Sequence, residues 1–263
     1  PTYNGQTGEC CSRTCRDSAP APGSSGSSRS QGSGGVPLCL QPNCGNATWN
    51  GKADEFCSKV CRRLGLPTSV CVKVSQEKFE EIQDQFVKKW DTGRRSVPRI
   101  KAMWAIHASK QARDRFHDKC ESIGDVACHN CGRTPGNRQR RFHGTVLKCK
   151  FNGKPCRNPA CSACRIIERG FDIRNLGKAT GNNGWYGPGH YSTSIASTAV
   201  GYGDHRTILV THVAVGVAEK SSAKTSSIVS PGYHSRVVNK GSGVDELLVP
   251  EDDQMLPAYL ILL

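Results

Sequence analysis

Short apolar segments separated by glycine-rich turns fill the C-terminal half of the chain, and this pattern predicts strands rather than long helices. The run TILVTHVAVG at residues 207–216 is rich in β-branched residues, as is typical of a buried strand. Two further apolar segments, at residues 244–249 and 257–263, predict two terminal strands. We therefore expect an α+β domain built on sheets, with few helices.

Two helices are expected before this strand-rich part. Residues 74–90 place apolar side chains on one helical face, with acidic residues early and lysines late, as the helix dipole favours. The apolar positions are Phe79, Ile82, Phe86 and Val87. We interpret residues 75–96 as an amphipathic helical connector. A strand over residues 99–106 and a helix over residues 109–120 then open a main domain that spans residues 97–263.

The N-terminal part contains a repeat interrupted by a linker. The sequence TYNGQTGECCSRTC at residues 2–15 matches TWNGKADEFCSKVC at residues 48–61. Residues 18–36 are rich in Gly, Ser and Pro and cannot bury enough apolar surface to become ordered, so we expect a disordered linker. This divides the region into a partial cysteine repeat at residues 1–17, the linker, and a complete cysteine knuckle at residues 37–74.

The chain contains 15 cysteines, most of them in closely spaced groups. Close spacing suits tetrahedral coordination of zinc by thiolates better than long-range disulfides. The complete knuckle predicts a structural zinc site with four ligands: Cys39, Cys44, Cys57 and Cys61. A second compact group predicts another closed zinc site: Cys149, Cys156, Cys161 and Cys164. Two alternatives stay open, namely unrelated reduced cysteines in the N-terminal region, and a second site in which Cys128 and Cys131 replace two ligands.

The net charge of +14 and a pI near 9.3 attract polyanions. The basic residues either form a solvated surface or contact nucleic acid, and the short basic runs match no DNA-reading motif. The sequence has neither a secretory signal nor an apolar run of about 18 residues. We therefore expect an intracellular protein, nuclear or cytoplasmic, with no membrane partner.

Four separated motifs carry the candidate chemistry, and each alone is a weak signal. They are His-Gly-Thr at residues 143–145, the glycine-rich turn and helix at residues 184–202, the strand at residues 207–216, and Glu246-Leu-Leu-Val with the closing Tyr-Leu-Ile. In this order they resemble the catalytic domain of diphtheria-toxin-like ADP-ribosyltransferases, the poly(ADP-ribose) polymerase group. The resemblance covers roughly residues 97–263 and looks closest to fungal versions, through the stretch CSACRIIERGFD at residues 161–172.

The resemblance implies the ADP-ribosyltransferase fold, in which two packed and mostly antiparallel sheets form a cleft for NAD⁺. It implies transfer of ADP-ribose from NAD⁺ to a protein or nucleic-acid acceptor, with release of nicotinamide. By similarity the catalytic residues are Glu246, His143 and Tyr191. The residues expected to bind NAD⁺ are His143, Gly144, Thr145, Tyr191, Ala199 and Tyr202.

These residue types suit the chemistry of NAD⁺ cleavage. A backbone N–H and C=O, assigned to Gly144, can pair with the carboxamide, while Tyr191 and Tyr202 can sandwich the nicotinamide ring. His143 is expected to donate to the ribose of the adenosine half. Cleavage passes through an oxocarbenium-like transition state, which the carboxylate of Glu246, held on a rigid strand, can stabilise.

The chain departs from the family at Thr198 and Ala199, where Lys-Ser is usual. Loss of the serine hydroxyl would weaken NAD⁺ binding by about 1 kcal/mol, if one neutral hydrogen bond is lost. Loss of the lysine favours mono-ADP-ribosylation. Two alternatives to an active enzyme are a weak or inactive homologue that acts as a zinc-dependent protein or nucleic-acid binding module, and a zinc protein that binds nucleic acid through its charge.

Overall fold

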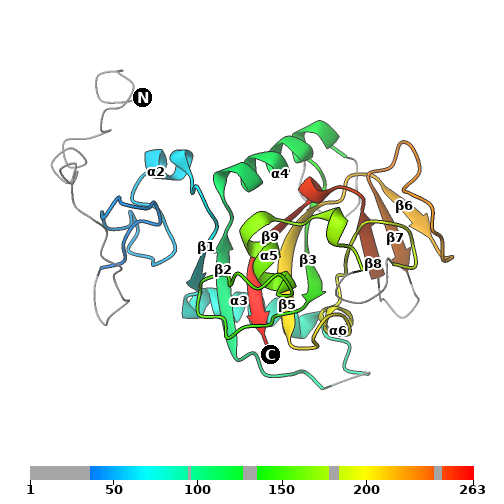
Figure 1. Ribbon diagram of the computed structural model, residues 1–263, viewed down its shortest axis with the longest axis horizontal. Helices are drawn as coiled ribbons and strands as arrows, with labels where there is room; N and C mark the ends of the chain where they lie inside the picture. The colour runs from blue at the N-terminus through cyan, green and yellow to red at the C-terminus, as the bar shows by residue number, and fades with distance from the viewer. Residues whose placement is uncertain (1–35, 94–95, 127–134, 178–183, 240–244) are drawn as a thin grey trace. The chain divides into compact units, whose positions relative to one another are not determined.

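The computed structural model describes residues 36–93, 96–126, 135–177, 184–239 and 245–263. These residues divide into two compact units whose boundary falls between Leu66 and Pro67 (Figure 1). The partial repeat at residues 1–17, nearly all of the predicted linker, and Cys128 and Cys131 lie outside the described residues.

The smaller unit is a knuckle that leads into a short helix. Leu38 and Ala47 form an isolated antiparallel bridge, and the turn that follows contains Gly51 at a φ of 70°, a conformation that favours glycine. Ser58 caps helix α2 (Lys59–Leu64), because its side chain accepts a hydrogen bond from the N–H of Cys61. The Asn-Gly and Cys-Ser elements of the sequence repeat thus supply a turn and a helix cap.

The larger unit contains two sheets. The five-stranded sheet has the order β1-β2-β9-β5-β3, and every neighbouring pair in it is antiparallel. Its strands are β1 (Val70–Lys73), β2 (Ala102–His107), β3 (Arg138–Thr145), β5 (Thr207–Ala214) and β9 (Met255–Leu262). The four-stranded sheet has the order β4-β8-β7-β6, with β6 and β7 parallel and the other pairs antiparallel. Its strands are β4 (His190–Ser192), β6 (Ala218–Ser221), β7 (Ser235–Asn239) and β8 (Asp245–Val249).

Helices cover both faces of the five-stranded sheet. Successive side chains of a strand point to opposite faces, and nearly all those of β5 are buried, so both faces must be covered. Ile208 and Val210 of β5 point to one face and join a core with α3 (Gln76–Lys88) and α6 (Ala196–Val200). Leu209, between them, points to the opposite face and packs with α5 (Ser162–Arg169). Two short 3-10 helices, η1 (Ile173–Asn175) and η2 (Asp252–Gln254), complete the described elements together with α4 (Lys110–Ile123).

Helix α3 is part of the larger unit, not a connector between domains. Ile82 and Phe86 are 0% exposed and lie in the same core cluster as Phe142 of β3. Strand β1, which we expected to belong to the knuckle, pairs with β2 instead. Because these contacts start immediately after Pro67, the boundary lies earlier than the predicted one at residue 74. Val87, expected on the apolar face, is 43% exposed.

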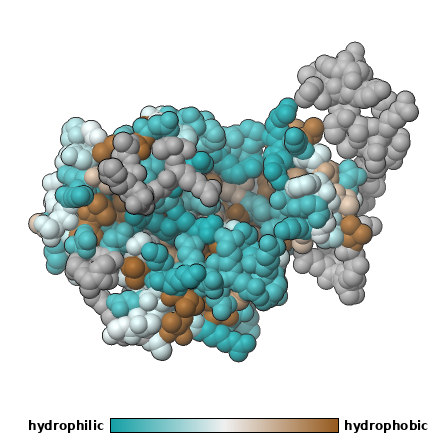
Figure 2. All heavy atoms as spheres, turned by 180° about the vertical axis from the view of Figure 1, so that it is seen from behind, coloured by the Kyte–Doolittle hydropathy of each residue, from teal (hydrophilic) through white to brown (hydrophobic). Residues whose placement is uncertain are grey.

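The predicted α+β class is confirmed for the described residues, with two mostly antiparallel sheets and few helices. The predicted strand at residues 99–106 and helix at residues 109–120 correspond to β2 and α4. In the view of Figure 2, hydrophilic residues cover most of the surface and hydrophobic residues form small, separate groups. The large aliphatic side chains of β5 and β8, and Leu260 and Ile261 of β9, are instead buried.

Candidate functional site

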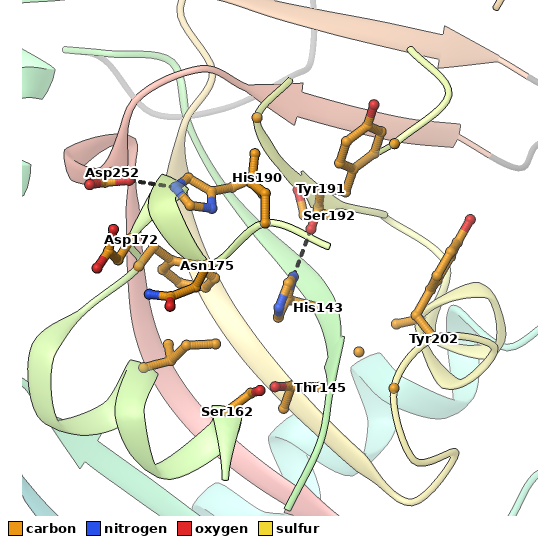
Figure 3. A pocket seen from close by; sticks show the side chains of 18 of the residues that line it. His143, Thr145, Ser162, Asp172, Asn175, His190, Tyr191, Ser192, Tyr202 and Asp252 are labelled. Atoms are coloured by element: carbon orange, nitrogen blue, oxygen red, sulfur yellow. Dashed lines mark hydrogen bonds and ion pairs between the residues drawn. The ribbon is translucent and has the colours of Figure 1, made fainter. Parts of the chain in front are cut away.

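A cavity of about 860 Å³ lies beside the end of β3, between α5, α6 and the four-stranded sheet. Its volume is in the range of roughly 300–1,000 Å³ that small-molecule sites usually have. Every residue that the sequence analysis assigned to NAD⁺ lines this cavity: His143, Gly144, Thr145, Tyr191, Ala199, Tyr202 and Glu246. The fold therefore brings together motifs that are far apart in the sequence. Figure 3 shows His143 between Tyr202 on one side and His190 on the other.

The backbone of Gly144 faces the open edge of the five-stranded sheet. Strand β3 is an edge strand, and on its open side Phe142 exchanges backbone hydrogen bonds of 2.8 and 3.0 Å with Thr193. The backbone N–H and C=O groups of successive residues in a strand point to opposite sides. Gly144, two residues after Phe142, therefore directs its N–H and C=O to the same open side. One backbone donor and one backbone acceptor of Gly144 therefore face the cavity.

Only glycine fits at position 144. A Cβ atom built there would lie 2.0 Å from the carbonyl oxygen of Ala199 and 2.8 Å from that of Tyr202. Both contacts are to backbone atoms, which cannot move aside as a flexible side chain can. The absence of a side chain at Gly144 thus lets the end of α6 approach β3 and form one wall of the cavity.

The imidazole of His143 is held by a backbone carbonyl. Its Nδ1 lies 2.7 Å from the carbonyl oxygen of Tyr191. Because a carbonyl oxygen only accepts, we assign the proton to Nδ1. Burial lowers the pKa of His143 to about 4, although the bond to Tyr191 opposes this shift. At neutral pH, Nε2 of His143 is therefore an acceptor, not the donor expected from the sequence.

Two tyrosines and Glu246 form the other side of the cavity. The hydroxyl of Tyr191 donates to the carbonyl of Gly187 over 2.7 Å and accepts from the N–H of Tyr186 over 3.0 Å. The hydroxyl of Tyr202 donates to the carboxylate of Glu246, which is only 4% exposed although it lines the cavity. Burial raises the pKa of Tyr191 to about 12, so this hydroxyl keeps its proton. Tyr202 is 45% exposed as a residue, and it lines the cavity.

Asp245 links the three segments that carry these side chains. One carboxylate oxygen accepts from the N–H and the hydroxyl of Ser194, each at 2.7 Å, and the other pairs with Arg141 of β3. Burial alone would raise the pKa of Asp245, but the charge of Arg141 and the bonds from Ser194 hold this pKa below its usual value. Asp245 is thus an anion that joins β3, the segment after β4, and β8.

The cavity also contains a pair that the sequence analysis missed. Nε2 of His190, a residue only 5% exposed, lies 2.7 Å from Oδ1 of Asp252 in η2, as Figure 3 shows. The pKa of His190 is lowered because burial outweighs the attraction of Asp252. Alternation along β4 could have placed His190 and Tyr191 on opposite faces. No local signal, however, connects His190 with an acid sixty-two positions away.

The predicted zinc ligands come together as two groups of four cysteines. Within each group, the sulfur atoms all lie within 4.8 Å of one another. The groups are Cys39, Cys44, Cys57 and Cys61 in the smaller unit, and Cys149, Cys156, Cys161 and Cys164 in the larger one. Four separations between their sulfur atoms are 3.5, 3.7, 3.5 and 3.7 Å. A zinc ion with tetrahedral bonds of about 2.3 Å separates its sulfur ligands by about 3.8 Å, so each group could hold zinc.

The second group fixes α5 beside the cavity. Cys161 is the residue that precedes α5, and Cys164 lies within the first turn. The Sγ atom of Cys161 also accepts a hydrogen bond of 3.2 Å from the N–H of Lys148, which ties the chain after β3 to the start of this helix. Further along α5, Arg165 lines the cavity. A metal at this position would therefore set the geometry of one cavity wall while leaving no open coordination position for chemistry.

No protein-family model and no curated protein matches this sequence. None of the described helices is both long and apolar enough to cross a lipid bilayer.

We predict that each cysteine group binds one zinc ion. The double variant Cys149→Ser/Cys156→Ser should bind one zinc ion fewer than the wild type, measured by elemental analysis of purified protein. Its melting temperature should fall, because α5 loses the tie at its start. Cys39→Ser/Cys44→Ser should also remove one zinc ion. Cys71→Ala, which changes a buried cysteine outside both groups, should retain the full zinc content. An unchanged zinc content in either double variant would contradict the assignment.

His143 should make the folded protein less stable at mildly acidic pH. Its pKa is about 4 in the folded chain and about 6.5 in the unfolded chain, so between these values only the unfolded state binds the proton. Stability from this residue is therefore complete above about pH 6.5 and falls as pH approaches 4, by an amount on the order of 1–3 kcal/mol. His143→Asn keeps a donor for the Tyr191 carbonyl and should reduce this loss.

Denaturant titrations at several pH values between about 4.5 and 7.5 would measure the effect as a difference between variant and wild type. Zinc loss at low pH acts on both proteins and cancels in that difference. The matched control is His117→Asn on the exposed surface of α4, which should follow the wild type. Parallel stability curves for His143→Asn and wild type would contradict the prediction.

Proposed function

We propose that this protein is an ADP-ribosyltransferase that cleaves NAD⁺, releases nicotinamide and transfers ADP-ribose to an acceptor. The proposal depends on one observation, namely that the seven residues assigned to NAD⁺ from the sequence all line one cavity. The two sheets beside this cavity are what the ADP-ribosyltransferase fold would require. The order of motifs along the chain supports the same family.

The edge of β3 and the two tyrosines suit the nicotinamide half. The N–H and C=O of Gly144, directed to the open edge, would pair with the carboxamide oxygen and nitrogen. Tyr202, part of whose ring is exposed, would stack on the nicotinamide, with Tyr191 on the other side. Nε2 of His143 would accept a hydrogen bond from a ribose hydroxyl and orient the dinucleotide.

Glu246 is suited to stabilise the positive charge that develops at the ribose. When the glycosidic bond breaks, nicotinamide leaves with the bonding electrons and the ribose acquires oxocarbenium character. A buried carboxylate held in place before the reaction stabilises this charge without the cost of reorganising water. Glu246 meets this requirement, since it lies on β8, accepts from Tyr202 and is adjacent to the fixed Asp245.

Ala199 and Thr198 favour a transferase that adds a single unit. Position 199 lines the cavity but carries no hydroxyl, so the carboxamide has only the Gly144 backbone as a partner from these two positions. Position 198, where the family usually carries a lysine associated with chain extension, is a threonine. We therefore propose mono-ADP-ribosylation, with a protein or nucleic-acid acceptor.

Glu246→Gln should decrease nicotinamide release by about 10²–10³-fold, as expected when a preorganised electrostatic group is removed from an active site. Glutamine can still accept the hydrogen bond from Tyr202, so NAD⁺ affinity and melting temperature should stay close to those of the wild type. The assay follows nicotinamide by chromatography with purified full-length chain. Glu251→Gln, an exposed acid in the same chain region, is the matched control and should keep wild-type activity. A wild type that releases no nicotinamide would instead identify a binding module.

Ala199→Ser should strengthen NAD⁺ binding by about fivefold, corresponding to one neutral hydrogen bond of about 1 kcal/mol. The new hydroxyl would lie at the cavity wall beside Gly144. Isothermal titration with NAD⁺ measures the affinity. Thr198→Ser, one residue earlier and outside the cavity lining, should leave the affinity unchanged. Equal affinities for Ala199→Ser and the wild type would show that the carboxamide does not lie at this wall.

A further inference from the structure

The loop between β3 and α5 combines a cysteine group with an unusual charge distribution. From Val146 to Ile167 the sequence contains no aspartate or glutamate. Four of its basic residues are exposed: Lys148, Lys150, Lys154 and Arg157. We call the segment that carries these four residues, residues 146–161, the basic loop. None of the ion pairs among the described residues involves them.

Zinc binding alone does not explain this charge. A zinc ion with four thiolates has a net charge of about −2, which nearby lysines could neutralise. The cysteine group of the smaller unit provides a comparison within the same chain. Between Cys39 and Cys61, two basic residues (Lys52, Lys59) are balanced by two acidic ones (Asp54, Glu55). Between Cys149 and Cys164, by contrast, Lys150, Lys154 and Arg157 stand with no acidic residue. The excess positive charge is therefore a property of this loop, not of a four-cysteine site.

The basic loop begins and ends at the cavity wall. On its N-terminal side Thr145 lines the cavity, and on its C-terminal side Ser162 and Arg165 do so. The hydrogen bond from Lys148 to Cys161 holds these two ends together. The four basic residues themselves are not part of the cavity lining. Lys148 is three residues from Thr145, whereas Phe151, further along the loop, packs against Trp104 of β2. The exposed positive surface therefore extends from the cavity wall toward the other edge of the five-stranded sheet.

We infer that the basic loop binds the phosphate backbone of a nucleic acid and presents that strand to the cavity as the acceptor of ADP-ribose. The inference rests on the proposed function and specifies its acceptor class. Exposed Lys and Arg side chains with no ion-pair partner, on a loop closed by the Lys148–Cys161 hydrogen bond, suit phosphate contacts, which need charge but no sequence readout. In the transfer, the bond between ribose C1′ and the nicotinamide nitrogen breaks, and nicotinamide takes the electron pair. A bond forms between C1′ and an oxygen or nitrogen of the strand, whose proton passes to water.

Binding is measured first, without NAD⁺, so that it does not depend on catalysis. Fluorescence anisotropy of full-length chain with labelled single- and double-stranded oligonucleotides of equal length is recorded over a series of salt concentrations. The variant K148Q/K150Q/K154Q/R157Q should lose at least about tenfold in affinity near 0.1 M salt, and the slope of log affinity against log salt should decrease in magnitude by about 3. The matched control K88Q/K89Q/K110Q/K220Q removes four exposed basic residues elsewhere. It should retain the wild-type affinity and the wild-type salt slope.

Two double variants, K148Q/K150Q and K154Q/R157Q, keep the test valid if the quadruple variant misfolds. Each should give about half the change in the salt slope. Zinc content and melting temperature should match the wild type. Equal binding by the wild type and the loop variants would overturn the inference. So would tighter binding to polyglutamate than to an oligonucleotide of equal charge, which would indicate an acidic protein partner.

Transfer is then measured with NAD⁺ labelled in its adenine half. Label should appear on the oligonucleotide with the wild type and decrease at least about tenfold with the loop variants, in parallel with binding. Nicotinamide release into water should remain, because the four residues are outside the cavity. If nicotinamide is released but the label appears only on protein, the inference that a nucleic acid is the acceptor would be wrong. No nicotinamide release from a wild type that binds oligonucleotides would instead overturn the proposed function and leave the docking surface in place.

Discussion

The carboxylate of Asp245 is the interaction on which the geometry of the cavity depends. It joins Arg141, two residues before His143, to Ser194, three residues after Tyr191, and is itself adjacent to Glu246. The imidazole of His143, the phenol of Tyr191 and the carboxylate of Glu246 thus lie on segments that one half-buried anion holds together. Removing one partner of such a group leaves an uncompensated buried charge, which is strongly destabilising. The candidate active site is therefore held by contacts that lie beneath it, not by the residues that face a ligand.

Much of the secondary structure could be predicted because its signals are local. The β-branched run of β5 and the apolar spacing of α3 each predict an element without knowledge of its neighbours. Those local signals could not show that α3 belongs to the core of the larger unit. Phe86 of α3 packs in the same core cluster as Phe142 of β3. The spacing of apolar residues within α3 cannot predict a contact with a distant strand. The domain boundary was misplaced for the same reason, since the pairing of β1 with β2 spans the whole of α3.

The order of the motifs along the chain was enough to predict which residues would line the candidate site. The sequence identified residues that line the cavity, but not how they are held. The proton position on His143 depends on the carbonyl of Tyr191, and the fit at Gly144 depends on the carbonyl of Ala199. Both partners are backbone atoms, whose positions no residue type encodes. The His190–Asp252 pair was missed because the two residues are far apart in the sequence. Only the assembled sheets bury His190 and bring it to Asp252.

The hydrogen bond between Lys148 and Cys161 has a consequence for how this protein can change over evolution. Since the base of the loop is closed at that point, the exposed residues between Cys149, Cys156 and Cys161 can vary in charge without displacing β3 or α5. Selection could therefore act on the exposed residues of the loop while the cavity keeps its shape. A loop closed at its base in this way can change its surface without changing the cavity beside β3.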